Sequence, residues 1–177
     1  MSKRRQRPSQ KGSDRGEYLS QLVQEYLVTR SLEAKQQVLA NLANFAYDPI
    51  NYEHLWQANA IDLFINGLED PDPLLNEFGA GGLANICSDS NHRQYIFLQP
   101  ECINLLKKTV CNAVNNTQAQ DETIINAMTT LMLLIEPSSQ QVICTPELKK
   151  GLEQLRSSEK SARVRTMTAL FLNDYFQ

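Results

Sequence analysis

The residues of this chain that could do chemistry are few and widely spaced. His54 and His92 each lack a neighbouring nucleophile and a ligand at position i+4, which favours a surface or half-packed role over catalysis or metal binding. The cysteines form no Cys-x-x-Cys pair and lie far from both histidines in the sequence. They are Cys87, Cys102, Cys111 and Cys144. This spacing is typical of reduced thiols and argues against a zinc site or a disulfide framework.

The segment GAGG at residues 79–82 is the one glycine-rich candidate for phosphate binding. It lies within a helical pattern rather than after a strand, and neither Gly-x-Gly-x-x-Gly nor a following Lys-Ser/Thr is present. Each glycine weakens a helix by about 1 kcal/mol relative to alanine. Two interpretations stay open: tight packing against neighbouring helices, or a bare patch that a partner approaches. Gly81 and Gly82 precede Asn85 by one turn, which favours the second for at least one of them.

Acidic residues complete the search for a catalytic group. The run EDPDP at residues 69–73 alternates acids with proline, which is typical of loops and helix caps rather than of a catalytic dyad. The only tryptophan, Trp56, lies on a short predicted helix, and we expect it to pack against neighbouring residues rather than contact a ligand. We therefore expect no enzyme, and neither a cofactor, a metal nor a small-molecule substrate.

The composition indicates one globular domain behind a basic tail. The chain has 177 residues, of which 42% are hydrophobic and 21% charged. No stretch approaches the about 18 apolar residues of a membrane span, and no apolar region of a secretory signal follows the N-terminal charges. Residues 1–16 hold six Lys/Arg against one acid, a charge of +5, so the rest carries −8 to reach the net −3.

These charges predict two regions. We expect residues 1–16 to be a disordered basic tail and residues 17–177 to be the folded domain. The tail suits a solubilising terminus, a nuclear-import signal or phosphate contacts to RNA. The sequence has no aromatic RNA-reading motif, so we expect any RNA contact to be mostly indirect.

Hydrophobic periodicity predicts helices throughout the domain and no sheet. Leu42, Leu83, Leu131 and Leu170 recur at spacings of 41, 48 and 39 residues, and each lies in a long segment with apolar residues at i, i+3, i+4 and i+7. The long segments are 32–46, 73–87, 120–135 and 160–176. Shorter helices are predicted at 17–29, 50–57, 60–68, 91–98, 101–114 and 146–156.

A unit of a short, a medium and a long helix thus recurs about every 40 residues. That period is typical of armadillo or HEAT repeats, in which stacked units bury a face that one unit cannot bury alone. LANLANFAYDP, from residue 39, and GGLANICSD, from residue 81, resemble the armadillo third helix. We predict an all-α, armadillo-type α-solenoid of three to four helical repeats: an incomplete first repeat, two fuller repeats and a final cap.

In the armadillo proteins that these motifs resemble, an asparagine of the third helix binds the backbone of an extended peptide. An amide suits that role because it offers both a donor and an acceptor. Asn44 and Asn85 match it, but Leu133 and Leu172 stand at the third and fourth positions. The residues one turn earlier, where import adaptors have tryptophan, are Ala40, Gly81, Thr129 and Thr168. A receptor for nuclear-import signals is therefore disfavoured.

Helical spacing from the two asparagines predicts a partner-binding concave face. Amides on a helix suit protein recognition, with a merely solvated face as the alternative for any single residue. The predicted contacts are Gln37, Asn41, Asn44, Asp48, Phe78, Gly81, Asn85, Asp89, Asn126 and Thr130, with Thr129 beside them.

AKQQVLANLANFAYDPINYEHL at 34–55, GGLANICSD, AMTTLMLL at 127–134 and SARVRTMTALFLNDYF at 161–176 are similar, in that order, to the armadillo repeat-containing protein seven family. This resemblance spans residues 17–176. It implies a nuclear, non-enzymatic scaffold that forms a heterodimer with an RNA-recognition-motif protein. In that family the pair serves the minor spliceosome, at the capped 5′ end of a U6-like small nuclear RNA, within a spliceosomal small nuclear ribonucleoprotein.

Two other functions stay open from the residues themselves. A general armadillo adaptor would bind extended peptide segments in its concave groove. A backbone-binding asparagine in every repeat would favour this function, but only Asn44 and Asn85 match that position. Direct RNA binding by the tail would be favoured by a basic folded domain, and this one is acidic. An acidic domain suits a basic protein partner.

Overall fold

The computed structural model describes residues 15–116 and 119–176. The first helix, α1, spans Arg15–Val28. It therefore includes Arg15 and Gly16, which the sequence placed in the basic tail, and the Arg15 guanidinium donates to Oδ1 of Asn51 at 3.3 Å. The other residues of the expected tail, 1–14, lie outside the described residues.

Within the described ranges the chain is helical and contains no strand. The N-terminal pair is α1 with α2 (Leu32–Phe45). Three repeats follow, each with a short, a medium and a long helix. The first is α3 (Tyr52–Gln57, after the 3-10 turn η1, Pro49–Asn51), α4 (Ala60–Glu69) and α5 (Pro73–Ile86). The second is α6 (Ser90–Phe97), α7 (Pro100–Asn112) and α8 (Asp121–Leu134), and the third is α9 (Gln140–Ile143), α10 (Pro146–Arg156) and α11 (Ala162–Tyr175).

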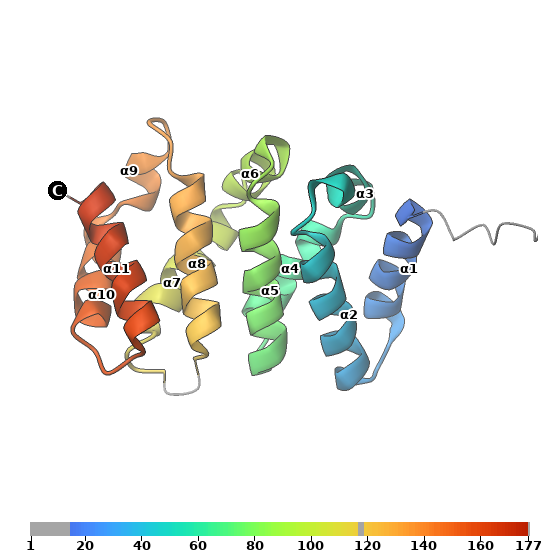
Figure 1. Cartoon of the computed structure of the whole chain (residues 1–177), viewed down its shortest axis with the longest axis horizontal. Coiled ribbons are helices and arrows are strands. Elements are labelled where there is room, and N and C mark those ends of the chain that lie inside the picture. The colour runs from blue at the N-terminus through green and yellow to red at the C-terminus, as the bar shows by residue number, and fades with distance from the viewer. Residues whose placement is uncertain (1–14, 117–118, 177) are drawn as a thin grey trace, which may run out of the picture.

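The long helices α2, α5, α8 and α11 stand side by side in one row, and α5 packs against both α2 and α8 (Figure 1). The short helices α3, α6 and α9 form a second row at one end of the long helices, while α4, α7 and α10 lie behind. The armadillo-type α-solenoid expected from the sequence is confirmed.

The last repeat is more complete than the sequence indicated. We expected only a final cap of two helices, but α9 supplies the missing short helix. Its four residues are too few to display a hydrophobic period. Ser139 precedes it and is buried, and its hydroxyl donates to the Leu134 carbonyl at 2.7 Å.

Asp-Pro and Thr-Pro pairs set the starts of several helices, as the sequence predicted. Asp72 caps α5 by accepting from the N–H groups of Leu74 and Leu75, and Pro73 takes the first helical position. Thr145 caps α10 by accepting from the N–H group of Leu148, and Pro146 takes the first helical position. The capping hydrogen bonds and the Gln36 amide hold the pKa of the Asp72 carboxyl below its usual value.

The core runs along the buried side of the long helices. Leu42, Leu83 and Leu131 are fully buried, as expected of repeat anchors. The fourth anchor was assigned wrongly, because Leu170 is 48% exposed whereas Leu172 is 7% exposed. The long helices begin at 32, 73, 121 and 162, spacings of 41, 48 and 41, so the residue equivalent to Leu131 in α11 is Leu172.

Two glycines of GAGG are required by close packing of α5 on α4. A Cβ at Gly79 would lie 2.4 Å from the Leu68 nitrogen and 2.6 Å from the Phe64 oxygen, and one at Gly82 would lie 2.3 Å from the Phe64 ring. Gly81 differs, because its Cβ would meet only Nδ2 of Asn126, at 3.5 Å. Close packing therefore accounts for Gly79 and Gly82, whereas the approach of a partner to Gly81 stays a prediction.

Candidate protein-binding surface

The long helices present one continuous surface, which we call the long-helix face. It consists of the exposed and half-buried residues on the outer side of α2, α5, α8 and α11. They are Gln37, Ala40, Asn41, Asn44, Phe78, Gly81, Asn85, Glu122, Ile125, Asn126, Thr129, Leu133, Arg163, Thr166, Met167, Leu170 and Asp174. Seven of the ten residues that the sequence predicted for partner binding lie here: Gln37, Asn41, Asn44, Phe78, Gly81, Asn85 and Asn126.

Thr130 was predicted for this face wrongly. Its side chain is 0% exposed, and its hydroxyl donates to the Asn126 carbonyl at 2.9 Å. By helix register Thr130 is equivalent to Gly82, the position that faces Phe64 of α4. A spacing of four residues from Asn126 therefore leads into the core, whereas a spacing of three leads to half-buried Thr129.

Asp48 and Asp89 also do not belong to the face, because each lies beyond the end of a long helix and caps the next short one. Asp48 accepts from the Ile50 N–H at the start of η1. Asp89 accepts from the N–H groups of Asn91 and His92 at the start of α6, and from the His92 ring. Both carboxylates thus serve helix starts.

The position at which armadillo proteins bind a peptide backbone, which we call the ladder position, is asparagine in the first half of the face (α2 and α5) but not in the second half (α8 and α11). Equivalent residues along the four long helices are Asn44, Asn85, Leu133 and Asp174. The sequence had placed Leu172 fourth, but that residue is buried. One turn earlier the fourth residue is exposed Leu170 rather than Thr168, which is fully buried. Both errors follow from the two-residue shift in the start of α11.

The two ladder asparagines have different environments. Asn44 is exposed. Asn85 is half-buried, and its Nδ2 donates to the carbonyl oxygen of Ala43 at 2.9 Å. Asn85 therefore joins α5 to one of the last carbonyls of α2, which lack partners within their own helix. The side-chain amide of Asn85 therefore uses one N–H within the fold, whereas the amide of Asn44 is exposed to a partner.

Charged residues join the second half of the face. The Arg163 guanidinium of α11 pairs with the Glu122 carboxylate of α8. On α5, burial and then the negative charge of Glu122 raise the pKa of the Glu77 carboxyl above its usual value. The same half also carries polar residues, Asn126, Thr129, Thr166 and Asp174, and its apolar surface residues include Ile125, Leu133 and Leu170.

Comparison with known proteins places this geometry in a family. The sequence is 38% identical over 159 residues to Armadillo repeat-containing protein 7 of the mouse, Mus musculus, which corresponds to 89% of this chain and 77% of that protein. The chain belongs to the armadillo repeat-containing protein 7 family. No protein-family profile matches the chain.

Solved armadillo structures share the fold of this family member. A computationally designed armadillo repeat protein for modular peptide recognition gives a TM-score of 0.73 at 20% identity, over 88% of this chain and 63% of that one. A designed armadillo repeat protein in complex with the peptide (KR)4 gives 0.72 at 19% identity, over 89% and 64%. This chain spans less than two thirds of those designed proteins, and at such identity the likeness shows the fold alone.

The thiols and histidines of this family member have mostly structural environments. All four cysteines are free. Burial raises the pKa of the Cys102 thiol to about 12, and burial, followed by the neighbouring Cys102, does the same for Cys87. His54 is half-buried, but His92 is only 2% exposed, so our expectation of a surface or half-packed role was wrong for His92.

Within residues 15–116 and 119–176, no helix has the length and apolarity of a membrane span.

Proposed function

We propose that this protein pairs through its long-helix face with an RNA-recognition-motif protein, as a nuclear heterodimer that supports minor-class pre-mRNA splicing. Membership of an armadillo family supports the coarser function, a protein-interaction scaffold. The finer function rests on the family resemblance of the sequence motifs. On this proposal the protein acts by binding alone, and its contact with the small nuclear ribonucleoprotein is mostly through the partner.

One observation carries the preference for a folded partner over an extended peptide. The ladder position reads Asn, Asn, Leu, Asp along the four long helices. A groove that binds a main chain along its length needs an amide in each repeat. Here only Asn44 and Asn85 qualify, and Nδ2 of Asn85 already binds Ala43. The apolar side chains of α8 and α11, such as Leu133 and Leu170, instead suit contact with the surface of a folded domain.

The charge of the chain is consistent with such a partner. The net charge of the chain is −3 and that of residues 1–16 is +5, so residues 17–177 carry a net charge of −8. An acidic surface attracts the basic flanks of an RNA-binding domain and repels the phosphates of the RNA itself. This complementarity favours an RNA contact made by the partner.

A general adaptor that binds extended peptides is the second candidate. The observation that favours it is the pair Asn44 and Asn85 on adjacent long helices, with Gln37 and Asn41 nearby. A designed protein with the same fold is recorded in complex with the peptide (KR)4. If this alternative holds, only α2 and α5 would bind the peptide, and the contacts to its backbone would span about two repeats.

Affinity capture from nuclear extract tests the proposal. The full chain, immobilised through a C-terminal tag, would be compared with Leu170→Asp and with Leu27→Asp. Leu170 is 48% exposed on the long-helix face, whereas Leu27 is 59% exposed on α1, so the same substitution is made at two exposed leucines. Bound proteins and RNAs would both be identified.

We expect the wild type and Leu27→Asp to recover one RNA-recognition-motif protein together with the minor-class U6-like small nuclear RNA, and Leu170→Asp to lose both. Recovery of many unrelated proteins that share an extended motif, without small nuclear RNA, would overturn the proposal in favour of the adaptor. Equal recovery by all three proteins would remove the long-helix face from the binding site.

A further inference from the structure

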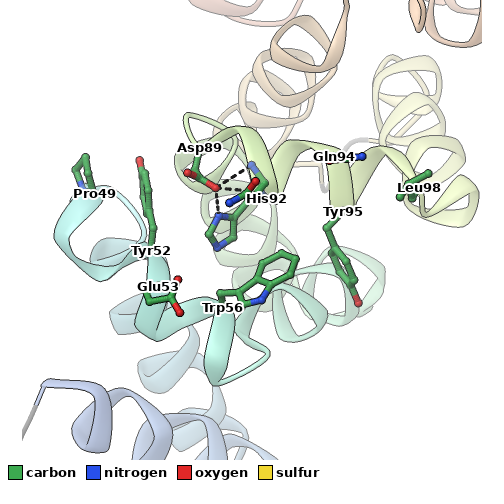
Figure 2. A pocket seen from close by; sticks show the side chains of 10 residues that line it. Pro49, Tyr52, Glu53, Trp56, Asp89, His92, Gln94, Tyr95 and Leu98 are labelled. Carbon is green, nitrogen blue, oxygen red and sulfur yellow. Dashed lines mark hydrogen bonds and ion pairs between the residues drawn. The ribbon is translucent and has the colours of Figure 1, made fainter.

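A second site lies between the short helices of the first two repeats, away from the long-helix face. A pocket of about 580 Å³ separates α3 from α6. Tyr52, Glu53 and Trp56 of α3 line one side, and His92 and Tyr95 of α6 line the other (Figure 2). Such a volume is typical of a ligand site.

His92 has a buried ring nitrogen with no partner in the described chain. The residue is 2% exposed, and its Nδ1 lies 2.5 Å from Oδ2 of Asp89. Nε2 is buried and makes no hydrogen bond. Because a carboxylate faces Nδ1, that nitrogen carries a hydrogen and donates it to Asp89. Buried polar atoms are rarely left unpaired, so the His92 ring is incompletely satisfied within the described chain.

Aromatic rings surround that nitrogen. The His92 ring projects toward α3 (Figure 2), with its centroid 5.6 Å from that of Tyr52 and 5.3 Å from that of Trp56. Trp56 also meets Tyr95 nearly at right angles, at 5.6 Å. Trp56 is nevertheless 41% exposed, so part of the indole is available to a ligand. Faces of aromatic rings carry partial negative charge and attract cations.

The charged groups at the pocket are acidic. Glu53 and Asp89 are among its lining residues, which include no lysine or arginine. Glu53 accepts from Gln57 through Oε1, and Tyr95 donates its hydroxyl to Asp62 at 2.8 Å. Burial by itself raises the pKa of the Asp89 carboxyl, but hydrogen bonds from His92 and Asn91 outweigh it and leave that pKa below its usual value. These carboxylates repel phosphate and therefore disfavour RNA.

We propose that this pocket binds an arginine side chain from an extended segment of a protein partner. A guanidinium is planar, positively charged and carries five N–H donors. It would stack on the exposed part of the Trp56 indole and place its N–H groups near the exposed Glu53 carboxylate. A lysine has the charge but not the plane, so the pocket selects arginine. This inference does not depend on which partner occupies the long-helix face.

Trp56 is the only tryptophan of the chain, so its fluorescence reports on this pocket directly. We would titrate the full chain with N-acetyl-arginine amide, with the lysine amide and with the citrulline amide, at constant ionic strength. Citrulline keeps the shape of arginine without the charge. We expect a saturable change with arginine and an apparent affinity at least tenfold weaker for citrulline, with lysine between them.

Glu53→Gln is the informative variant, because Glu53 is exposed and its carboxylate accepts a hydrogen bond from Gln57 of the same helix. We expect it to weaken arginine binding about threefold to tenfold, in line with the loss of one exposed charge contact. Glu153→Gln, an exposed glutamate on α10, is the matched control and should leave binding unchanged. Circular dichroism checks that both variants remain folded.

Three results would overturn the inference. The first is no saturable response to arginine, or an equal response to citrulline. The second is a saturable response to adenosine monophosphate but not to arginine, which would assign the pocket to RNA. The third is a response to arginine only after Arg4, Arg5 and Arg7 are all changed to glutamine, which would make residues of this chain the occupant instead of a partner.

Discussion

The two halves of the long-helix face have the same geometry and different chemistry. In the first half, α2 and α5 present the amides Asn44 and Asn85 at equivalent positions. In the second half, α8 and α11 present Leu133 and Asp174 there, with Leu170 exposed one turn earlier. One fold thus carries a surface suited to backbone hydrogen bonds beside a surface suited to apolar burial.

This difference shows which terms of binding energy each half can supply. A hydrogen bond to an exposed amide contributes about 0.5–1.5 kcal/mol, because water competes for the same groups. Burying a leucine side chain contributes about 1.5–3 kcal/mol. We therefore expect the second half to contribute most of the affinity and the first half to contribute orientation.

The two halves keep their relative position only if α5, the helix of the first half that packs against α8, is held rigidly, and Gly79 allows its close packing on α4. Gly79→Ala would place a Cβ 2.4 Å from the Leu68 nitrogen, which α4 cannot avoid without moving. We expect a loss of about 3 kcal/mol in the free energy of unfolding, measured by urea denaturation. Gly81→Ala is the matched control, because its Cβ has room and alanine favours helix by about 1 kcal/mol. Equal effects of the two substitutions would contradict the packing account.

A substitution in each half tests the assignment of affinity. Leu170→Asp removes an exposed apolar side chain from the second half and should weaken partner binding at least about tenfold. Asn44→Ala removes one exposed amide from the first half and should weaken it about threefold or less. Binding of the purified partner, measured by calorimetry, gives both values. The reverse order would place the main contact on the amides and favour the peptide adaptor.

The two ladder asparagines should differ in stability as well. Asn85→Ala removes the bond to the Ala43 carbonyl and should lower the free energy of unfolding by about 1 kcal/mol. Asn44→Ala, at an exposed position, should change it by less than about 0.5 kcal/mol. Thermal unfolding monitored by circular dichroism distinguishes them. Identical midpoints would mean that the bond from Asn85 does not join the two helices in solution.

The smallest effect concerns the junction of the halves, where Glu77 has a raised pKa. Burial and the nearby Glu122 make its ionised form unfavourable in the folded state. Folding therefore costs free energy above the raised pKa, and that cost disappears as the pH falls below the usual glutamate value. Glu77→Gln should raise Tm by roughly 1 °C at pH 7 and by nothing near pH 3.5. A lowered Tm at pH 7 would contradict this sign.

Most of the fold was predictable because its signals are local. Asp72 with Pro73 and Thr145 with Pro146 mark helix starts chemically, and the long helices display a complete hydrophobic period. The last helix was placed out of register because Leu170 and Leu172 both fit an apolar pattern. The burial of Leu172 depends on the start of α11 at Ala162, which the sequence did not indicate.

The site was only partly predictable because exposure depends on the neighbouring helix. Asn126 is followed by Thr129 and Thr130, and one turn of helix allows either to share its side, but only contact with the core decides that Thr130 is buried. The contacts of the His92 ring with Tyr52 and Trp56 join two repeats, so they could not be read from either repeat alone. Tyr52 with Trp56, and His92 with Tyr95, form i, i+4 and i, i+3 pairs on two short helices, the only signal in the sequence that could have indicated this pocket.

Hydrogen exchange of the chain with and without a bound partner tests most directly the proposal that the partner covers the long-helix face mainly at its second half. Exchange would be compared between the free chain and its complex with the protein recovered from nuclear extract. We predict slower exchange in all four long helices, with the largest change in α8 and α11. Slower exchange confined to α4, α7 and α10, with α8 and α11 unchanged, would contradict it.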